Sequence, residues 1–243
     1  MNILIISDIH ANLLALEAVL KAAPDYDAVW CLGDLVGYGP NPNECVERVR
    51  ALPGLLCLVG NHDKAVLGEI PLEVFNHDAR AAIRWTQGAA TPETLDYLSS
   101  LKPADQRRPY TLAHASPRQP VWEYILDCFI AEANFPYFDT PYCLVGHSHV
   151  PVIYREDPAS GECHEEAPDY GEPRQLCEQR LIINPGSVGQ PRDGNAAAAY
   201  AFLDLATNRW EFCRVAYDLP GTQARMRQAR LPDRLIARLA YGW

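Results

Sequence analysis

The sequence contains 8 cysteines but no CxxC pair or other spacing typical of paired metal-binding cysteines. Cys31, Cys57 and Cys143 lie inside apolar runs, where a reduced and buried thiol is the usual state. A disulfide framework is characteristic of much shorter secreted chains. We therefore expect free cysteines and no cysteine-bound structural zinc.

Positive charge is also scarce, because 21 lysines and arginines face 31 acidic residues, giving a net charge of −10 and a pI near 5.1. Such a surface repels phosphate backbones, so we expect no stable nucleic-acid complex. The first apolar stretch has no positively charged leader, and no apolar run reaches the roughly 20 residues of a membrane span. These absences predict a soluble protein of the cytoplasm without membrane association.

Three common catalytic motifs are missing as well. Neither Ser148 nor Ser187 lies in the Gly-x-Ser-x-Gly pattern of a nucleophile elbow. The sequence has no phosphate-cradling P-loop and no GxGxxG strand-to-helix turn. Serine hydrolases, P-loop nucleotide hydrolases and dinucleotide-binding enzymes are therefore disfavoured.

Apolar runs alternate with helical periodicity in the first quarter of the chain. Residues 2–6, 28–32 and 55–59 predict buried strands, and Asn12 is the expected N-cap of the first helix. Three successive strand–loop–helix units favour a mostly parallel sheet flanked by helices. The second helix is expected from Asn43 to Leu52.

The rest of the chain has a mixed pattern. Residues 64–108 are expected to form a small helical cap insertion, and the acidic segment 156–178 an exposed loop or loose hairpin. A helical tail is expected over 222–239. Further strands are predicted at 110–113, 142–145, 150–154, 181–183, 196–205 and 210–217. We predict an α/β (α+β) fold within one domain, 1–243, in which two mixed sheets pack face to face with helices outside.

Five clusters of potential metal ligands follow the apolar runs: Asp8-Ile9-His10, Gly33-Asp34, Gly60-Asn61-His62-Asp63, His114 and Gly146-His147-Ser148-His149. Five of the 7 histidines fall inside them. If the chain is extended there, side chains two residues apart point the same way, so Asp8 with His10, and His147 with His149, can each face one ion. Asp34 stands alone, and its two oxygens can bridge two ions.

The charge of such a site indicates its ligand. Two divalent ions, two aspartates and one hydroxide leave a charge of about +1, which suits a phosphate group. Metal coordination lowers the pKa of water from 15.7 to roughly 7, which generates hydroxide at neutral pH.

The five clusters in this order resemble the calcineurin-like metallophosphoesterase superfamily. The segment Asn184-Pro185-Gly186-Ser187-Val188-Gly189-Gln190-Pro191-Arg192 is similar to its small bacterial and archaeal phosphodiesterase branch. The resemblance spans residues 8 to about 192. It implies a four-layer αββα sandwich with two divalent metal ions at the sheet edges, manganese being the first choice and iron, zinc or nickel the alternatives.

The resemblance also implies roles for individual residues. Asp34 would bind both ions, and His62 would be the catalytic residue that contacts phosphate and protonates the leaving oxygen, an effect worth ~10²–10⁴-fold. Asn61, His62 and Arg192 are the expected substrate contacts. The first ion would be held by Asp8, His10, Asp34 and His149, and the second by Asp34, Asn61, His114 and His147.

The second cluster departs from the GDxxDRG motif of protein serine/threonine phosphatases. In Gly33-Asp34-Leu35-Val36-Gly37-Tyr38-Gly39 the second Asp and the Arg are missing. A small phosphate ester, with nucleotides among the candidates, is therefore the expected substrate, and phosphodiesterase activity the leading prediction. Phosphomonoesterase or protein phosphatase-like activity, and a non-catalytic scaffold with the same fold, are the alternatives.

Overall fold

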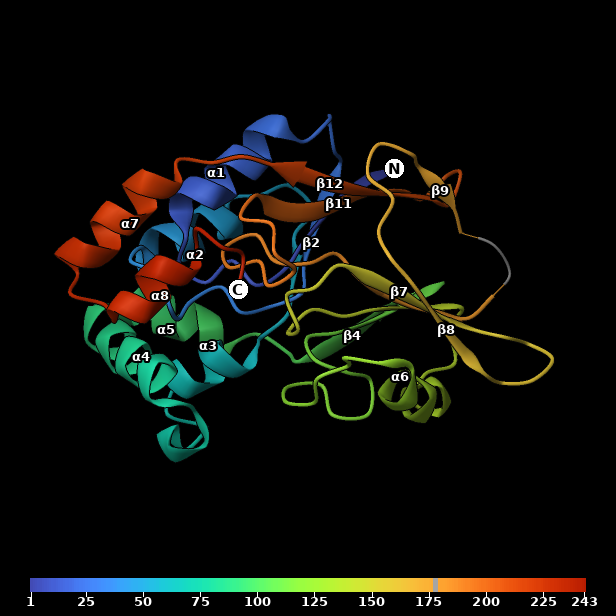
Figure 1. The fold of residues 1–243 in the computed structure, drawn as a ribbon, viewed down its shortest axis with the longest axis horizontal. Helices are drawn as coiled ribbons and strands as arrows, with labels where there is room; N and C mark the ends of the chain where they lie inside the picture. The colour runs from blue at the N-terminus through green and yellow to red at the C-terminus, as the bar shows by residue number, and fades with distance from the viewer. Residues whose placement is uncertain (177–178) are drawn as a thin grey trace.

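The first strand, β1 (Asn2–Ile6), is buried between two cores. Ile3 and Ile5 face the core between the two sheets, whereas Leu4 and Ile6 face the helices. This alternation explains why the whole run is apolar. The structure is a computed structural model that describes residues 1–176 and 179–243 (Figure 1).

The first sheet has six strands in the order β3-β2-β1-β11-β12-β9. Strands β1, β2 and β3 run parallel, as the strand–loop–helix units predicted, and β11 joins β1 antiparallel. Besides β1, the strands are β2 (Ala28–Cys31), β3 (Leu56–Cys57), β9 (Arg174–Gln175), β11 (Ala198–Asp204) and β12 (Arg209–Val215).

The second sheet has the order β4-β5-β6-β10-β7-β8. Its central strands β5, β6 and β10 run parallel, and the outer pairs are antiparallel. The strands are β4 (Ala104–Arg107), β5 (Tyr110–Ala113), β6 (Tyr142–Leu144), β7 (Val152–Glu156), β8 (Cys163–Glu166) and β10 (Leu181–Asn184).

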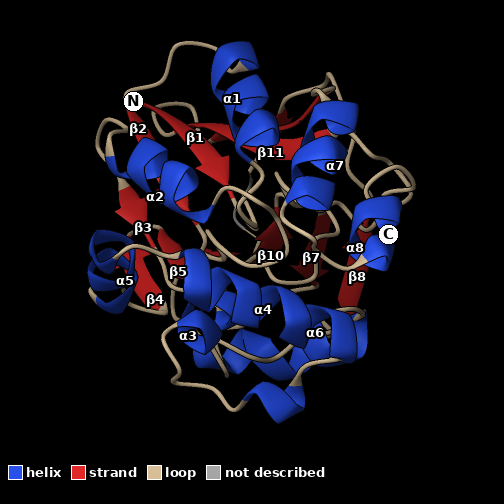
Figure 2. Ribbon diagram, turned by 90° about the vertical axis from the view of Figure 1, so that its left-hand side faces the viewer, coloured by secondary structure: helices blue, strands red, loops and turns tan. Residues whose placement is uncertain are grey.

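Helices cover the outer face of each sheet, which confirms the four-layer αββα sandwich (Figure 2). The core between the sheets contains the fully buried Trp210 and Tyr110. The second sheet is covered by α6 (Cys128–Asn134) and the 3₁₀ turn η2 (Phe135–Tyr137). The helices over the first sheet are α1 (Leu13–Ala22), α2 (Pro42–Arg50), α3 (Asn61–Val66), α4 (His77–Ala89), α5 (Pro92–Ser99), α7 (Leu219–Gln228) and α8 (Asp233–Arg238).

The predicted insertion 64–108 differs from the structure at its end. It contains α4, α5 and the 3₁₀ turn η1 (Leu72–Val74), but residues 104–107 form β4, the edge strand beside β5. An edge strand with solvated side chains lacks the apolar alternation that marks a strand in the sequence. Buried residues of both helices, Ile83 and Leu98 among them, share the core of the first sheet.

The predicted N-cap of the first helix is confirmed. The side chain of Asn12 caps α1 by accepting from Ala15 N at 3.2 Å. The acidic segment 156–178 contains the hairpin strand β8 and the short β9, whereas its last residues, Cys177 and Glu178, lie outside the described residues. The cysteines that the structure describes are free. Among the described helices, none has the length and apolarity needed to cross a membrane.

Candidate metal centre

The seven predicted metal ligands come from five places along the chain and meet at one edge of the two sheets. Asp8 follows β1, Asp34 follows β2, and His114 follows β5. Asn61 begins α3 just after β3, and the turn after β6 carries His147 and His149. All seven side chains are buried. Their donor atoms form two groups that share Asp34, the first being Asp8, His10, Asp34 and His149, and the second Asp34, His114 and His147.

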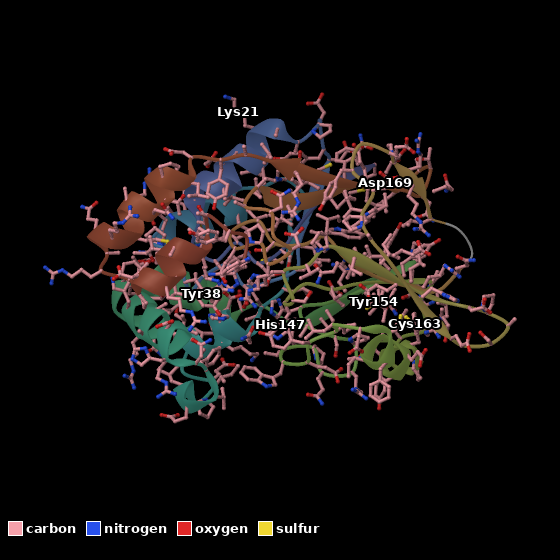
Figure 3. All side chains as sticks on the ribbon, in the orientation of Figure 1. Lys21, Tyr38, His147, Tyr154, Cys163 and Asp169 are labelled. Atoms are coloured by element: carbon pink, nitrogen blue, oxygen red, sulfur yellow. The ribbon has the colours of Figure 1, made fainter. Side chains whose placement is uncertain are left out.

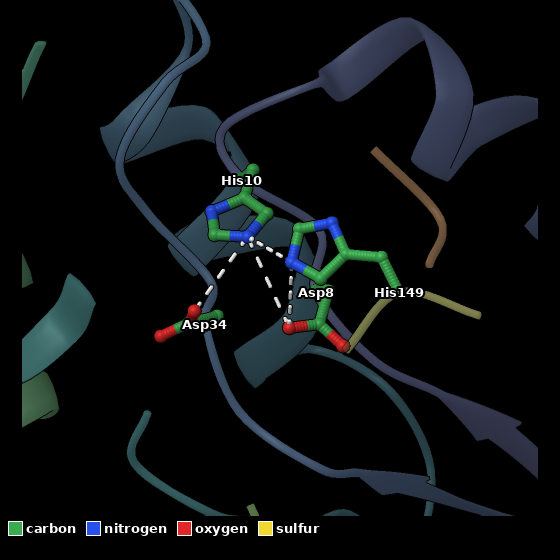
Figure 4. A group of neighbouring side chains, drawn as sticks. All are labelled: Asp8, His10, Asp34 and His149. Carbon is green, nitrogen blue, oxygen red and sulfur yellow. Dashed lines mark hydrogen bonds and ion pairs between the residues drawn. The ribbon is translucent and has the colours of Figure 1, made fainter. Parts of the chain in front are cut away.

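The first group is drawn in Figure 4. Nε2 of His10 lies 3.1 Å from Nε2 of His149 and 3.5 Å from Oδ2 of Asp34. Oδ1 of Asp8 lies 3.3 Å from Nε2 of His149. These donors are close enough to surround one cation.

The second group continues from the same carboxylate. Oδ2 of Asp34 lies 3.6 Å from Nε2 of His114, which in turn lies 3.3 Å from Oδ1 of Asn61. Oδ2 is buried and has no hydrogen-bond donor among the described residues, whereas Oδ1 accepts from the backbone N of His62 at 2.9 Å. One carboxylate oxygen is therefore fixed and the other is left between the two groups.

The histidines are oriented by main-chain carbonyls. Nδ1 of His10, His114 and His149 lies 3.1, 2.8 and 2.6 Å from the carbonyl oxygens of Val36, Leu32 and Gln190, respectively. A carbonyl can only accept, so each Nδ1 carries the hydrogen and each Nε2 presents its lone pair to the centre. Two lone pairs facing each other at 3.1 Å, as between His10 and His149, repel unless a cation lies nearby. This donor set fits divalent metal ions.

His147 is held differently. Its Nε2 lies 3.3 Å from the carbonyl oxygen of Trp122, and its ring stacks on Tyr124 with centroids 3.8 Å apart. Both contacts come from the loop between β5 and α6, which therefore fixes one side of the centre. His147 and Tyr38 lie near the middle of the molecule (Figure 3).

The expected extended geometry of the ligand pairs is wrong. Asp8 and His10 have φ values of 53° and 47°, and His147 and His149 have values of 65° and 62°. Left-handed backbone at non-glycine residues costs of order 1–3 kcal/mol each. Hydrogen bonds to the neighbouring loop hold it here, because Asp8 N and His10 N donate to Gly33 O and Asp34 O at 3.0 and 2.9 Å.

The electrostatics of the site favour neutral histidines. Burial, aided by the positive charges of His149 and His62, lowers the pKa of His10 well below its usual value. Burial followed by the charge of Arg192 lowers the pKa of His149 to about 4. A neutral imidazole has no proton to displace before it binds a metal ion.

The aspartates respond in opposite directions. Burial alone would raise the pKa of Asp8, but His149, His114 and His10 together outweigh it and the pKa is lowered. Burial, together with Asp63 and Asp8, raises the pKa of Asp34 well above its usual range. Buried carboxylates without enough positive charge are unfavourable, so a bound cation would stabilise the ionised form of Asp34.

His62 lies among aromatic rings beside the centre. The ring centroids of Tyr38, His10 and Phe75 are 4.3, 4.9 and 5.2 Å from that of His62. Its Nδ1 has no hydrogen-bond partner among the described residues. A Cβ added at Gly37 would lie 2.7 Å from this nitrogen, so the position where GDxxDRG has its second Asp points at His62.

Arg192 reaches the same region from the loop before β11. Its guanidinium carbon lies 5.9 Å from the centroid of the Tyr38 ring, and Nη2 donates to Oε1 of Gln190 at 3.1 Å. Nε is buried and unpaired within the described part of the chain. Burial, and then the positive charge of Arg192, lowers the pKa of His62 well below its usual value. The structure thus brings Arg192 toward the site, next to the tyrosine that replaces the motif arginine.

Ser7, Asn184 and Asp63 support the site through hydrogen bonds. Ser7 Oγ donates to Oδ2 of Asp8 at 2.6 Å, and Asn184 Nδ2 donates to Gly146 O at 2.7 Å and Ser148 Oγ at 2.9 Å. Asp63 accepts from Gly60 N and Val36 N at 2.9 and 3.0 Å, so it supports its loop. Ser7 has no sequence signal of its own, and Asn184 lies in the motif-like segment 184–192 without a predicted role, so the structure is needed to identify both as supports.

The chain is similar to known phosphoesterases over most of its length. A model of the calcineurin-like phosphoesterase superfamily domain matches residues 1–208. The chain is 40% identical to an uncharacterized protein of Methanocaldococcus jannaschii, covering 99% of this chain and 98% of that protein. A metallophosphoesterase structure from Sphaerobacter thermophilus is 50% identical, with a TM-score of 0.92 and coverage of 100% of this chain and 99% of that chain.

A shorter match is to the symmetrical bis(5'-nucleosyl)-tetraphosphatase of Yersinia enterocolitica. It is 38% identical over 71 residues, which cover 28% of this chain and 24% of that enzyme. The family match covers most of the chain, and the fold and the whole-length match to the metallophosphoesterase structure agree with it. This protein therefore belongs to the calcineurin-like phosphoesterase superfamily and is a hydrolase that acts on phosphoric ester bonds.

Proposed function

We propose that this protein is a phosphodiesterase that hydrolyses small phosphate esters with two divalent metal ions, by direct attack of water and without a covalent enzyme intermediate. The observation that carries the proposal is the position of Asp34. Its unpaired Oδ2 lies 3.5 Å from Nε2 of His10 and 3.6 Å from Nε2 of His114. A carboxylate oxygen between two sets of donors suits a bridging ligand.

Two bound divalent ions would supply a Lewis acid for the phosphoryl oxygens and water of lowered pKa. Asp8, His10, Asp34 and His149 would hold one ion, and Asp34, Asn61, His114 and His147 the other. The oxygen donor of Asn61 and the nitrogen donors do not distinguish manganese from iron, zinc or nickel. We propose manganese first.

The chain's own side chains would act on the ester. His62 would contact the phosphate and give a proton to the leaving oxygen, which removes the negative charge that develops there. The guanidinium of Arg192 would hold a non-bridging phosphoryl oxygen, because its buried Nε has no other partner in the described structure. Asn61 borders the same space at the start of α3.

A small substrate is favoured over a phosphoprotein. The motif that orients the catalytic histidine and grips phosphate in protein phosphatases has Gly37 and Tyr38 in place of its Asp and Arg. The partial similarity to a bis(5'-nucleosyl)-tetraphosphatase supports a nucleotide ester as substrate. A non-catalytic scaffold would require lost ligands, whereas all seven predicted ligands are present and buried.

The test is a pair of chromogenic esters offered to protein reconstituted with manganese. We expect turnover of bis(p-nitrophenyl) phosphate, slower turnover of p-nitrophenyl phosphate, and loss of turnover in Asn61→Ala and Asp34→Asn. Asp25→Asn, at an exposed position, is the matched control and should behave as wild type. Faster turnover of the monoester would instead make the protein a phosphomonoesterase. Unchanged turnover in both site variants, with circular dichroism intact, would overturn the proposed metal centre.

A further inference from the structure

A cavity of about 630 Å³ lies between the start of α4 and the segment from α8 to Trp243. Asn76 and His77 line one wall, and Arg234, Arg238 and Trp243 line the other. Its volume falls in the range of 300–1,000 Å³ that is usual for small-molecule sites. None of the predicted metal ligands lines it, so it is a separate space.

The cavity is nevertheless next to the centre. Phe75, the residue before Asn76, packs its ring 5.2 Å from that of His62. Gly242 O accepts from Gly194 N at 2.9 Å, which ties the segment after α8 to the loop that carries Arg192. Consistent with this, burial and then the charge of Arg192 lower the pKa of Arg238 to about 10. The cavity therefore lies on the side of the centre that holds His62 and Arg192.

One of the two arginines that line the cavity, Arg234, is exposed and has no hydrogen bond or ion pair with any described residue. Nε of Arg238 donates to the main-chain oxygen of Trp243. Among the lining side chains that the structure describes, Asp78 has the one carboxylate, and it lies 3.3 Å from Nδ1 of His77. On a chain with a net charge of −10, this local excess of arginine favours an anion.

Two aromatic rings border the same space. Tyr241 and Trp243 stack with centroids 5.1 Å apart and an interplanar angle of 29°. Both remain largely exposed, at 57% and 64%. A stacked pair with an open face is a surface on which a planar base can stack.

We propose that this cavity binds the nucleoside end of a nucleotide ester. A further phosphate of the ester would contact Arg234 and Arg238, and the base would stack on Tyr241 and Trp243. This inference rests on the proposed function only in assigning the cleaved phosphate to the metal centre. It specifies the substrate as a nucleotide rather than any small phosphate ester.

Binding is tested without catalysis, by titrating metal-free protein with ADP and with inorganic pyrophosphate in a calorimeter. We expect ADP to bind at least tenfold more tightly than pyrophosphate, and Trp243→Ala and Arg234→Ala each to weaken ADP binding about tenfold. Phe129→Ala and Arg227→Ala are matched exposed controls outside the cavity and should bind ADP as wild type. Equal affinity for ADP and pyrophosphate, or unchanged ADP binding in both cavity variants, would overturn the proposal.

A kinetic comparison links the cavity to the reaction. We expect Trp243→Ala and Arg234→Ala to lower the ratio of kcat/KM for thymidine 5'-(p-nitrophenyl phosphate) to that for bis(p-nitrophenyl) phosphate by about tenfold. A ratio that stays at the wild-type value in both variants would contradict the nucleoside site. Absence of turnover of either ester by manganese-loaded wild type would contradict the proposed function alone, because ADP binding is measured independently.

Discussion

Gly37 lies directly against His62, and a Cβ added to Gly37 would be 2.7 Å from Nδ1 and 3.1 Å from Cβ of the histidine. The φ of Gly37 is +87°, a conformation that L residues rarely adopt. The chain therefore orients His62 by the packing of Tyr38 and Phe75 rather than by a carboxylate. Glycine is required here both by the backbone and by the space.

Gly37→Ala should displace His62 and lower kcat for bis(p-nitrophenyl) phosphate by about 100-fold, toward the loss expected for His62→Ala. Manganese binding should be retained, because the three atoms nearest to the added Cβ all belong to His62, which is not a predicted metal ligand. Steady-state kinetics and metal analysis measure the two effects. Gly88→Ala is the control, since a Cβ there meets nothing within 4 Å in helix α4. Wild-type kcat in Gly37→Ala would show that the position of His62 does not limit the reaction.

The two donor groups predict that each metal ion can be removed separately by a substitution in its own group. Wild type should bind two equivalents of manganese. His149→Gln, in the first group, and His114→Gln, in the second, should each retain one, because Asp34 still serves the intact group. Elemental analysis after gel filtration measures the bound metal. Two equivalents in both variants would contradict this division of the ligands.

The sequence predicts where the strands end but not the backbone conformation of the ligand-bearing turns. The apolar runs correctly place Asp8 and Asp34 at strand ends, because buried strands need apolar residues on both faces. The left-handed turns at these residues leave no such pattern, since they depend on hydrogen bonds to a neighbouring loop such as His10 N to Asp34 O. The edge strand β4 leaves no pattern either, because its solvated side chains lack the apolar alternation that marks a strand.

Residues that act through packing are equally hidden from the sequence. The side chain of Tyr124 is 42% exposed, yet its ring stacks on that of His147. The cavity beside α8 joins segments that are more than 150 residues apart. No local spacing encodes such contacts, so they require the fold.

The metal-free protein should lose stability as the pH falls from 6.5 to 4. Burial lowers the pKa of His149 to about 4 from an ordinary value of 6.5, so in this window the unfolded chain binds a proton that the folded chain does not. The stabilisation is present above pH 6.5 and decreases as the pH falls toward 4. For this fully buried group it amounts to about 3 kcal/mol.

Urea unfolding of EDTA-treated protein at a series of pH values measures this slope. His149→Gln removes the titrating group and should flatten the slope between pH 6.5 and 4 relative to wild type. His77→Gln, at a ring that is 94% exposed, is the matched control and should keep the wild-type slope. Equal slopes in wild type and His149→Gln would show that His149 is not held neutral by the fold.

Asn184 should position both histidines of the turn after β6. It is buried at the end of β10, where Nδ2 donates to Gly146 O and Ser148 Oγ, and Oδ1 accepts from Gly186 N at 2.8 Å. Asn184→Ala leaves Gly186 N without its acceptor, at a cost of about 1–3 kcal/mol for an unsatisfied group. It also removes one donor from Gly146 O and one from Ser148 Oγ, which among the described residues keep only their contacts with Ser148 N and Val150 N. The turn that carries His147 and His149 would then be held less firmly, so manganese affinity should fall about tenfold, in the range known for lost supports of metal ligands.

Calorimetric titration measures the affinity and urea unfolding the stability, with Asn195→Ala, in the exposed loop before β11, as control. A variant with reduced stability but wild-type manganese affinity would show that Asn184 supports the fold and not the centre, because a positioning residue must change both.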